Sequence, residues 1–237
     1  MPSTESLKSD VSTIISTTWN KRKGNKVPST NSVALSGGAV ELEATFLYAD
    51  LASSSKMAKE LDRRVAAKIL KSFLSCSTKL INGLGGTVIS FDGDRVLGVF
   101  VGNTKNTDAA KCALQINYVV KNIIKEKFEN SYQSVRDASF TITHAVGVDQ
   151  GTVLIVRGGA RGSNDLLSIG RAPNLAAKLS ELRESKYKTF ITASVYNKLM
   201  DKSKFGGLEN KNMWTACTWK FLGDTLNLYK SSWTWKP

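Results

Sequence analysis

The chain has 237 residues, a hydrophobic share of 41% and a charged share of 22%, proportions that are typical of a globular protein with a full hydrophobic core. No apolar run reaches the roughly 18 to 20 residues of a membrane-spanning helix, and the first residues lack the basic and apolar regions of a secretory signal. The formal net charge of +13 favours a polyanionic partner, and a nucleic acid or a nucleoside triphosphate would fit.

The distribution of cysteines and basic residues narrows these possibilities. Cys76, Cys112 and Cys217 are widely spaced and form no CxxC pair, so we expect free thiols and a cytoplasmic protein that does not associate with a membrane. The basic residues are scattered, apart from a short cluster at residues 21–26, and no basic stripe with interleaved aromatic residues is present. We therefore expect no stable nucleic-acid partner.

The predicted elements begin after a polar segment. Residues 1–41 are rich in Ser, Thr and Asn, and we interpret them as an N-terminal extension. Residues 42–200 carry the strand and helix patterns of one domain, and residues 201–237 are expected to add C-terminal strands to that domain.

In the first half of the domain, short apolar runs alternate with helical periodicity. The pattern predicts a strand at 43–50, an amphipathic helix from Lys56 to a break at 83–86, strands at 87–91 and 95–100 around an Asp-Gly turn, and a helix from Thr107 or Asp108. The second half predicts strands at 140–148 and 152–156, a glycine-rich loop at 157–163, a helix near 173–183, a strand at 189–192, a short helix to Met200 and a terminal strand pair.

The order strand, helix, strand, strand, helix, strand is the split βαβ pattern of a ferredoxin-like or palm-type α+β domain, in which helices flank an antiparallel-rich sheet. In such a sheet the first strand pairs antiparallel with the third, and the hairpin between the second and third lies where the first strand ends. Asp50 closes the first strand and Asp94 follows the hairpin turn. We therefore expect the two carboxylates to face each other.

Two converging carboxylates repel each other, and hard divalent cations relieve that repulsion. Two cations held in this way can clamp a phosphoryl group. Ser53 and Ser54 follow Asp50 at a predicted helix start, where free backbone amides and hydroxyls can bind phosphate. The residues alone also allow a plainer interpretation, with Asp50 as a helix cap and Asp94 as a hairpin residue.

Three segments together resemble the class III nucleotidyl cyclases. ATFLYADLASSS (44–55) is similar to the family's first metal motif, and FDGDRVLGVF (91–100) is similar to the hairpin that carries its second metal aspartate. HAVGVDQGTVLIVRGGARGSNDLLSIGRAPNLAAKL (144–179) resembles the family's third block. The resemblance covers roughly residues 42–200, with the motifs in order and at appropriate spacing.

The resemblance implies a metal site and a dimer. Asp50, Asp94 and the Leu51 carbonyl would hold two ions, Mn²⁺ or Mg²⁺, in each active site. Asn174 stands where the family orients the ribose, and Lys178 stands where the family has an arginine that stabilises the transition state. In the family these two residues come from the partner chain, so a homodimer with active sites at its interface is implied.

The resemblance also places substrate-binding residues. Lysine in place of arginine at 178 keeps the charge but loses the bidentate fork, so Arg171 or Arg95 could share its role. Ser90 and Leu167 occupy the two positions whose side chains recognise the purine base in the family. Neither is the residue type that adenylate or guanylate cyclases have there. Tyr48 lies two residues before Asp50 and therefore on the same strand face, where it could narrow the pocket for a smaller base.

These departures resemble the bacterial pyrimidine cyclases of the Pycsar antiphage systems. The resemblance implies an enzyme that converts UTP or CTP to 3′,5′-cyclic UMP or cyclic CMP and pyrophosphate in antiviral defence. Two alternatives stay open at this point. One is an adenylate or guanylate cyclase with altered base contacts, and the other is a noncatalytic module that binds nucleotides or nucleic acid.

Overall fold

A nine-stranded mixed sheet forms the centre of the molecule, and the computed structural model describes it together with all of residues 1–237. Its strands are β1 (Asn20–Gly24), β2 (Gly38–Ala52), β3 (Thr87–Asp92), β4 (Arg95–Phe100), β5 (Thr143–Ala160), β6 (Ser163–Ile169), β7 (Thr189–Thr192), β10 (Thr215–Phe221) and β11 (Asp224–Ser231). The order is β10-β11-β7-β5-β2-β4-β3, with β1 beside β2 and β6 beside β5. Only the β5–β7 and β1–β2 pairs are parallel. The sheet is therefore rich in antiparallel pairs, as predicted.

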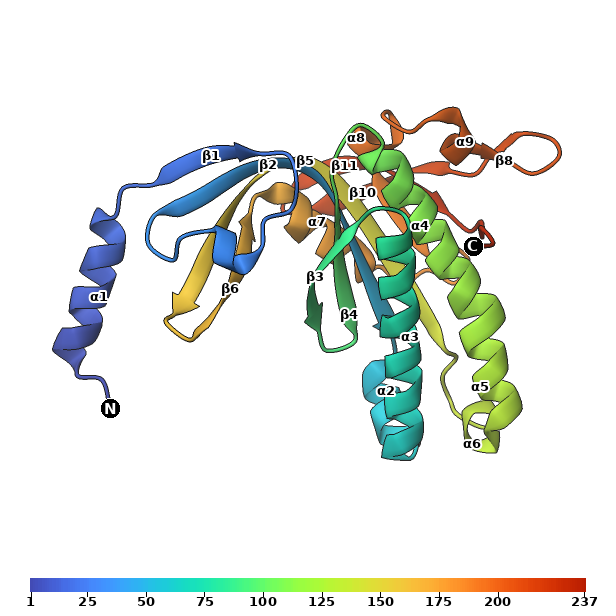
Figure 1. The fold of residues 1–237 in the computed structure, drawn as a ribbon. Helices are drawn as coiled ribbons and strands as arrows, with labels where there is room; N and C mark the ends of the chain where they lie inside the picture. The colour runs from blue at the N-terminus through green and yellow to red at the C-terminus, as the bar shows by residue number, and fades with distance from the viewer.

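The helices flank this sheet. They are α1 (Thr4–Ser16), α2 (Ser54–Glu60), α3 (Arg63–Gly83), α4 (Lys105–Val119), the π-helix η2 (Val120–Ile124), α5 (Lys125–Ser131), α6 (Gln133–Arg136), α7 (Arg171–Ser180), α8 (Ala193–Tyr196), α9 (Asp201–Lys204) and the 3-10 turn η1 (Thr30–Ser32). Helix α3 and the continuous column α4–η2–α5 lie side by side over one face (Figure 1). A small ribbon, β8 (Phe205–Gly206) with β9 (Lys211–Asn212), lies outside the sheet. No helix is both long and apolar enough to cross a bilayer.

The main core lies between the sheet and helices α3 and α4. Alternate residues of β2, among them Leu47 and Leu51, point to this face, where they join Ile69 and Phe73 of α3 in a cluster of 30 buried residues. Burying each large side chain of this kind stabilises the fold by about 1.5 to 3 kcal/mol. The spacing of the apolar residues that predicted the helices therefore reflects contact with this face.

Helix α7 covers the opposite face at very short range. Its Ala172 and Ala176 pack against Phe46, which points to the other side of β2 from Leu47. Gly147 of β5 makes the close approach possible, because a methyl group there would lie 2.1 Å from the Ala176 carbonyl oxygen. The helix that carries three predicted site residues, Arg171, Asn174 and Lys178, is thus held directly against the sheet.

The predicted helix from Lys56 is wrong in one respect, because it is two helices. Helix α2 ends at Glu60, and α3 begins at Arg63 after a break. The Asp62 carboxylate accepts a hydrogen bond from the Arg64 amide at 2.9 Å, which is an N-terminal cap that starts a new helix. The helix predicted from Thr107 or Asp108 begins two or three residues earlier than predicted, at Lys105.

The two strands predicted at 140–148 and 152–156 are one 18-residue strand, β5. Gln150 and Gly151 pair with Thr45 and Ala44 of β2, so the expected turn is part of the ladder. The glycine-rich segment predicted as a loop forms the end of β5 and its hairpin with β6. Gly162 supplies the positive φ of 85° that the hairpin turn requires.

The two ends of the chain contribute differently to the fold. Helix α1 has no buried residue and projects away from the body (Figure 1). From Asn20 onward the N-terminal segment joins the sheet, since β1 pairs with the first residues of β2, which begins at Gly38. At the other end, β11 pairs with β7 and extends the same sheet.

Candidate active site

Asp50 and Asp94 meet at one end of the sheet. Asp50 is opposite Arg95 in the β2–β4 ladder, and the Leu51 amide donates a hydrogen bond to the Asp94 carbonyl at 3.3 Å. Gly93 adopts a φ of 61° in the turn between β3 and β4, and the turn delivers Asp94 to the end of β2. The strand order therefore produces the convergence that the sequence pattern predicted.

The Asp50 carboxyl lies in an unfavourable place for a negative charge. It is only 6% exposed, and burial raises its pKa, although Arg183 acts in the opposite direction; the charge of Asp94 raises the pKa further. No group of three or more His, Cys, Asp and Glu side chains gathers anywhere in the chain. The donors at this place are two carboxylates and the backbone carbonyl of Leu51. Hard oxygens of this kind suit Mg²⁺ or Mn²⁺, so the residues fit the divalent ions that the resemblance implies.

Arg183 is the nearest positive charge to this carboxylate, and the sequence did not point to it. Its guanidinium binds the Asp50 carboxylate and donates a second hydrogen bond to the Ser180 carbonyl at 2.7 Å. Arg183 thus ties the segment after α7 to the end of β2. The only hint in the sequence is a basic residue four positions after the third motif, and that alone predicts no contact with Asp50.

A chain of ion pairs connects Arg95 with Lys178. Glu181 accepts from Arg95 at 3.3 Å and from Lys178 at 2.8 Å, while Arg95 also binds Asp92 at 2.9 Å. Glu181 is a second residue that sequence reasoning missed. It links Lys178 to Arg95, but no contact joins Lys178 to Asp50 or Asp94 of the same chain.

Asn174 lies one helical turn before Lys178, and both side chains are exposed. The Asn174 amide donates to the Gly170 carbonyl at 3.2 Å. Arg171, at the start of α7, does not join the carboxylate pair. It lies 3.9 Å from Asp149, a buried carboxylate that also accepts a hydrogen bond from Thr192 at 2.6 Å.

Tyr48, which was predicted to narrow the pocket, and Ser90, one of the two predicted base-reading residues, lie in one row. Tyr48 of β2 and Ser90 of β3 are both opposite Leu97 of β4, so the row crosses three strands. Burial raises the pKa of the Tyr48 phenol, and Arg95 opposes this effect. Because Asp50 is two residues beyond Tyr48, the row and the carboxylate share a face.

Leu167 is not near this row within one chain. It pairs with Val156 of β5, whereas Asp50 pairs with Ala145, so the two lie toward opposite ends of that strand. The Leu167 side chain is 48% exposed. A single chain therefore leaves Leu167 apart from the carboxylates.

Ser53 and Ser54, the two predicted phosphate-binding serines, lie at the start of helix α2. Ser53 has a left-handed backbone, with φ at 66°, and makes no capping hydrogen bond to α2. The helix that follows has only seven residues. Ser54 is its first residue and is partly exposed.

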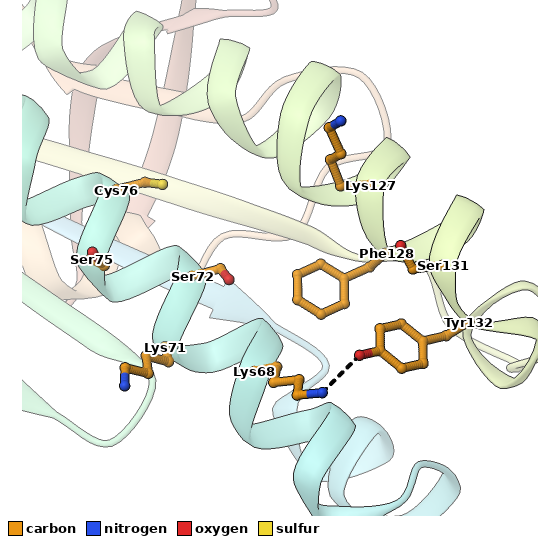
Figure 2. Close-up of a pocket in the computed structure, with 9 residues that line it drawn as sticks. All are labelled: Lys68, Lys71, Ser72, Ser75, Cys76, Lys127, Phe128, Ser131 and Tyr132. Carbon is orange, nitrogen blue, oxygen red and sulfur yellow. Dashed lines mark hydrogen bonds between the residues drawn. The ribbon is translucent and has the colours of Figure 1, made fainter.

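A cavity of about 530 Å³ lies elsewhere, between α3 and α5. Figure 2 shows the rings of Phe128, in α5, and Tyr132, just after α5, pointing toward α3, where the Lys68 amine donates to the Tyr132 hydroxyl at 2.9 Å. None of the residues that line this groove belongs to the site around Asp50.

Comparisons with known proteins agree with the geometry. A uridylate cyclase from Rhodovulum sp. (strain MB263) is 54% identical over 235 residues, which is 98% of this chain and 97% of the relative. A uridylate cyclase from Burkholderia cepacia is 41% identical over 219 residues, 92% of this chain and 91% of that protein. The adenylyl cyclase CyaB from P. aeruginosa has a similar fold, with a TM-score of 0.67 and 18% identity over 81% of this chain and 95% of its own. No protein-family model matches the chain.

Identity of this degree along nearly the whole of both chains establishes the family, and the solved structure establishes the fold. The first two motifs lie on the elements that the resemblance predicted, with Asp50 at the end of β2 and Asp94 in the β3–β4 hairpin. This chain is a nucleotidyl cyclase and belongs to the class III family, together with the uridylate cyclases that it resembles.

Proposed function

We propose that the chain converts a pyrimidine nucleoside triphosphate, UTP or else CTP, to its 3′,5′-cyclic monophosphate and pyrophosphate. The observation that carries the proposal is the Asp50–Asp94 pair, which lies on the same sheet face as a row of residues without a charged base-reading group. The similarity to uridylate cyclases along the whole chain supports UTP as the substrate.

Tyr48 and Ser90 suit a small, uncharged base. The phenol ring takes up room that the second ring of a purine would need. Both hydroxyls can donate and accept hydrogen bonds, so they can match the keto and imino edge of uracil. A lysine or glutamate at position 90 would instead favour a purine, by the pattern of the resembled family.

In the proposed reaction the ribose 3′-hydroxyl gives up its proton to water and its oxygen attacks the α-phosphorus. The bond from the α-phosphorus to the bridging oxygen of the β-phosphate breaks, and pyrophosphate leaves with that electron pair. Divalent ions, when bound, lower the pKa of the attacking hydroxyl and neutralise the charge on pyrophosphate. Asp50, Asp94 and the Leu51 carbonyl would hold two such ions, Mn²⁺ or Mg²⁺.

The basic residues at the same end of the sheet would bind the phosphates. Arg183 already contacts Asp50, so it lies within reach of a triphosphate at that position. Its planar guanidinium can bind two phosphate oxygens at once. Arg95 directly follows Asp94, and Ser53 and Ser54 come three and four residues after Asp50, so their side chains would add further contacts.

We also propose that a second copy of the chain completes each active site. Asn174 and Lys178 are exposed on α7, and Leu167 lies far from Asp50 along β5. A head-to-tail homodimer would bring these residues of one chain to the carboxylates of the other. There Asn174 would orient the ribose, and Lys178 would stabilise the charge on the α-phosphate in the transition state.

The cellular role follows from the resemblance to the Pycsar cyclases. We propose that the cyclic pyrimidine nucleotide is a second messenger in antiphage defence and that the enzyme works in the cytoplasm. The three free cysteines are compatible with a reducing compartment. A phage-challenge assay that compares cells with the wild type and cells with Asp94→Asn tests the role, and equal plaque numbers would contradict it.

The substrate is tested by incubating the purified protein with each of the four ribonucleoside triphosphates and Mn²⁺, followed by mass spectrometry of the products. The proposal predicts cyclic UMP, or cyclic CMP, as the main product. Cyclic AMP or cyclic GMP as the main product would identify a purine cyclase. Failure to form any product, with nucleic acid retained at physiological salt, would favour a noncatalytic module.

A further inference from the structure

A second cavity, of about 400 Å³, lies on the opposite side of the sheet from Asp50. One wall is the helical column around η2, and the other is the segment between α7 and β7. His144 lines this cavity and is opposite Leu51 in the β5–β2 ladder. Leu51 points into the core beneath α3 and α4, whereas Asp50, its neighbour, points to the other face. The cavity is therefore separate from the site that holds the two carboxylates.

The lining of this cavity is strongly positive. Lys121 and Lys125 come from the helical column, and Lys186 and Lys188 come from the segment before β7. The lining includes no Asp or Glu. Lys125 is paired with Glu129 at 2.8 Å, but no ion pair engages Lys121, Lys186 or Lys188. Burial lowers the pKa of Lys188, and the nearby charge of Arg183 lowers it further. Positive charges gathered without counter-charge are stabilised by a bound anion.

Neutral donors complete the polar lining. Four hydroxyl groups line the cavity, on Thr141, Thr143, Ser185 and Ser232. Only two lining residues, Val120 and Ile142, are apolar, and no aromatic ring is present. Such a lining can bind the oxygens of an anion through many hydrogen bonds, and any attached group would be bound without aromatic stacking.

His144 is a second and independent indication of a ligand. The residue is 2% exposed, and neither of its ring nitrogens has a hydrogen-bond partner. Burial, with the charges of Lys188 and Arg183, lowers its pKa to about 3, so the ring is neutral at physiological pH. A buried polar group without a partner is costly, and native proteins rarely retain one without a reason. Both ring nitrogens are closed off from the cavity, so the ring would turn toward a bound anion before a ligand oxygen accepts the hydrogen bond that its N–H does not make.

The backbone is unusual at the same place. Residues 120–124 form a π-helical turn inside an otherwise α-helical column, and this turn carries Val120 and Lys121 into the lining. Turns of this kind are rare and are frequent at functional sites.

From these observations we propose that the cavity around His144 is a binding site for a phosphate-bearing anion, which it recognises through its phosphoryl oxygens. Its volume falls within the range of small-molecule sites, so it accepts a pyrophosphate or a mononucleotide. The lysines neutralise the charge of the phosphoryl group, and the hydroxyls and the His144 ring bind its remaining oxygens.

The bound anion would act on the catalytic side through a short segment of chain. Lys188 and Ser185 line the cavity, and Arg183, two residues before Ser185, binds Asp50 on the other side of the sheet. The Lys188 amine donates to the Glu184 carbonyl at 2.7 Å, which couples the position of this lysine to the backbone next to Arg183. Occupation of the cavity would therefore order the segment 183–188.

The binding experiment is calorimetric titration with sodium pyrophosphate and, separately, with UMP. It is carried out with EDTA at fixed ionic strength, so that binding through divalent ions makes no contribution. The proposal predicts saturable binding of at least one probe, with one site per chain. Binding of pyrophosphate alone identifies an inorganic ligand, and binding of UMP alone identifies a nucleotide. Absence of saturable binding for both probes would overturn the proposal.

Variants locate the binding site. Lys121→Gln with Lys188→Gln removes one lysine from each wall and should weaken binding by about tenfold or more for each lysine lost. The matched control is Lys71→Gln with Lys127→Gln, which removes one lysine from each wall of the groove in Figure 2 and should leave binding unchanged. Asp94→Asn should also leave it unchanged. Equal weakening in the control pair, or loss of binding in Asp94→Asn, would contradict the proposal.

Two further measurements separate loss of the site from loss of the fold. Lys121 is exposed on its helix, so Lys121→Gln alone should keep the melting temperature of the wild type and still weaken binding. Hydrogen exchange of residues 117–125 and 183–188 should slow when the probe binds to the wild type. Because none of these readouts is cyclase activity, they are independent of the proposed reaction.

Discussion

The Arg183 guanidinium binds the Asp50 carboxylate across 133 residues of sequence. The contact joins the end of β2, which carries Asp50 and Leu51, to the segment that follows α7, the helix of Asn174 and Lys178. It also supplies the one ion pair of a carboxylate whose burial raises its pKa. The site is therefore arranged around a charge that is costly to bury and useful for binding cations.

Removing the Arg183 guanidinium should leave the buried Asp50 carboxylate unpaired and lower the stability of the fold. With EDTA present, Arg183→Gln is expected to lower the free energy of unfolding by about 1 to 2 kcal/mol. Breaking a fully buried ion pair costs roughly 3 to 5 kcal/mol, and the expected loss is smaller because the Arg183 side chain is 44% exposed. Saturating Mn²⁺ should raise the melting temperature more in Arg183→Gln than in the wild type, since the ion no longer competes with Arg183. An equal Mn²⁺ effect in both proteins would show that Arg183 and the ion do not share Asp50.

His144 should make the protein sensitive to acid. Its folded pKa of about 3 lies below its unfolded value of about 6.5, so its contribution is fully present above pH 6.5 and is lost as pH falls toward 3. Between pH 7.5 and pH 5 the wild type should lose about 2 kcal/mol more stability than His144→Leu. Denaturant unfolding at the two pH values measures the difference, and parallel losses in both proteins would contradict the assignment.

Tyr48 should contribute to recognition of the pyrimidine. Tyr48→Phe keeps the ring and removes only the hydroxyl, so kcat/KM for the preferred substrate should fall by about tenfold with little change in melting temperature. The ratio of UTP to CTP turnover should change as well, because the hydroxyl would bind the edge at which the two bases differ. Unchanged kinetics with both substrates would mean that Tyr48 does not contact the base.

Mixing two inactive variants tests the shared site. Asp94→Asn and Lys178→Ala should each lose most activity alone, the lysine variant by roughly a hundredfold. If the two residues come from different chains, an equal mixture that exchanges subunits should recover about a quarter of wild-type activity, because half of the dimers then hold one intact site of two. Absence of recovery, with subunit exchange shown by tagged pulldown, would place both residues on the same chain's site.

The first half of the fold was predictable from local patterns. The β3–β4 hairpin has an Asp-Gly turn between apolar runs, and its ladder with β2 follows from the order of the elements. Asp50 and Asp94 could be brought together on that basis alone. The break between α2 and α3 also had a local indication, since Asp62 is a good N-terminal cap.

Other features depend on tertiary contacts and could not be predicted in the same way. Asp149-Gln150-Gly151 has the composition of a turn, but pairing with the long strand β2 keeps β5 extended through it. Arg183 and Glu181 reach the site only because α7 packs closely on Gly147. Their partners are distant in sequence, so no spacing rule points to them.

The most direct test compares Asp94→Asn with Asp92→Asn in the UTP cyclisation assay with Mn²⁺. Both changes remove one negative charge from the same hairpin, but Asp92 is exposed and pairs with Arg95, whereas Asp94 lies beside Asp50. We expect Asp94→Asn to abolish cyclic UMP formation and Asp92→Asn to retain at least about a tenth of wild-type activity, because an exposed ion pair contributes roughly 1 kcal/mol or less. Substantial activity in Asp94→Asn, with its fold intact, would contradict the paired-carboxylate site.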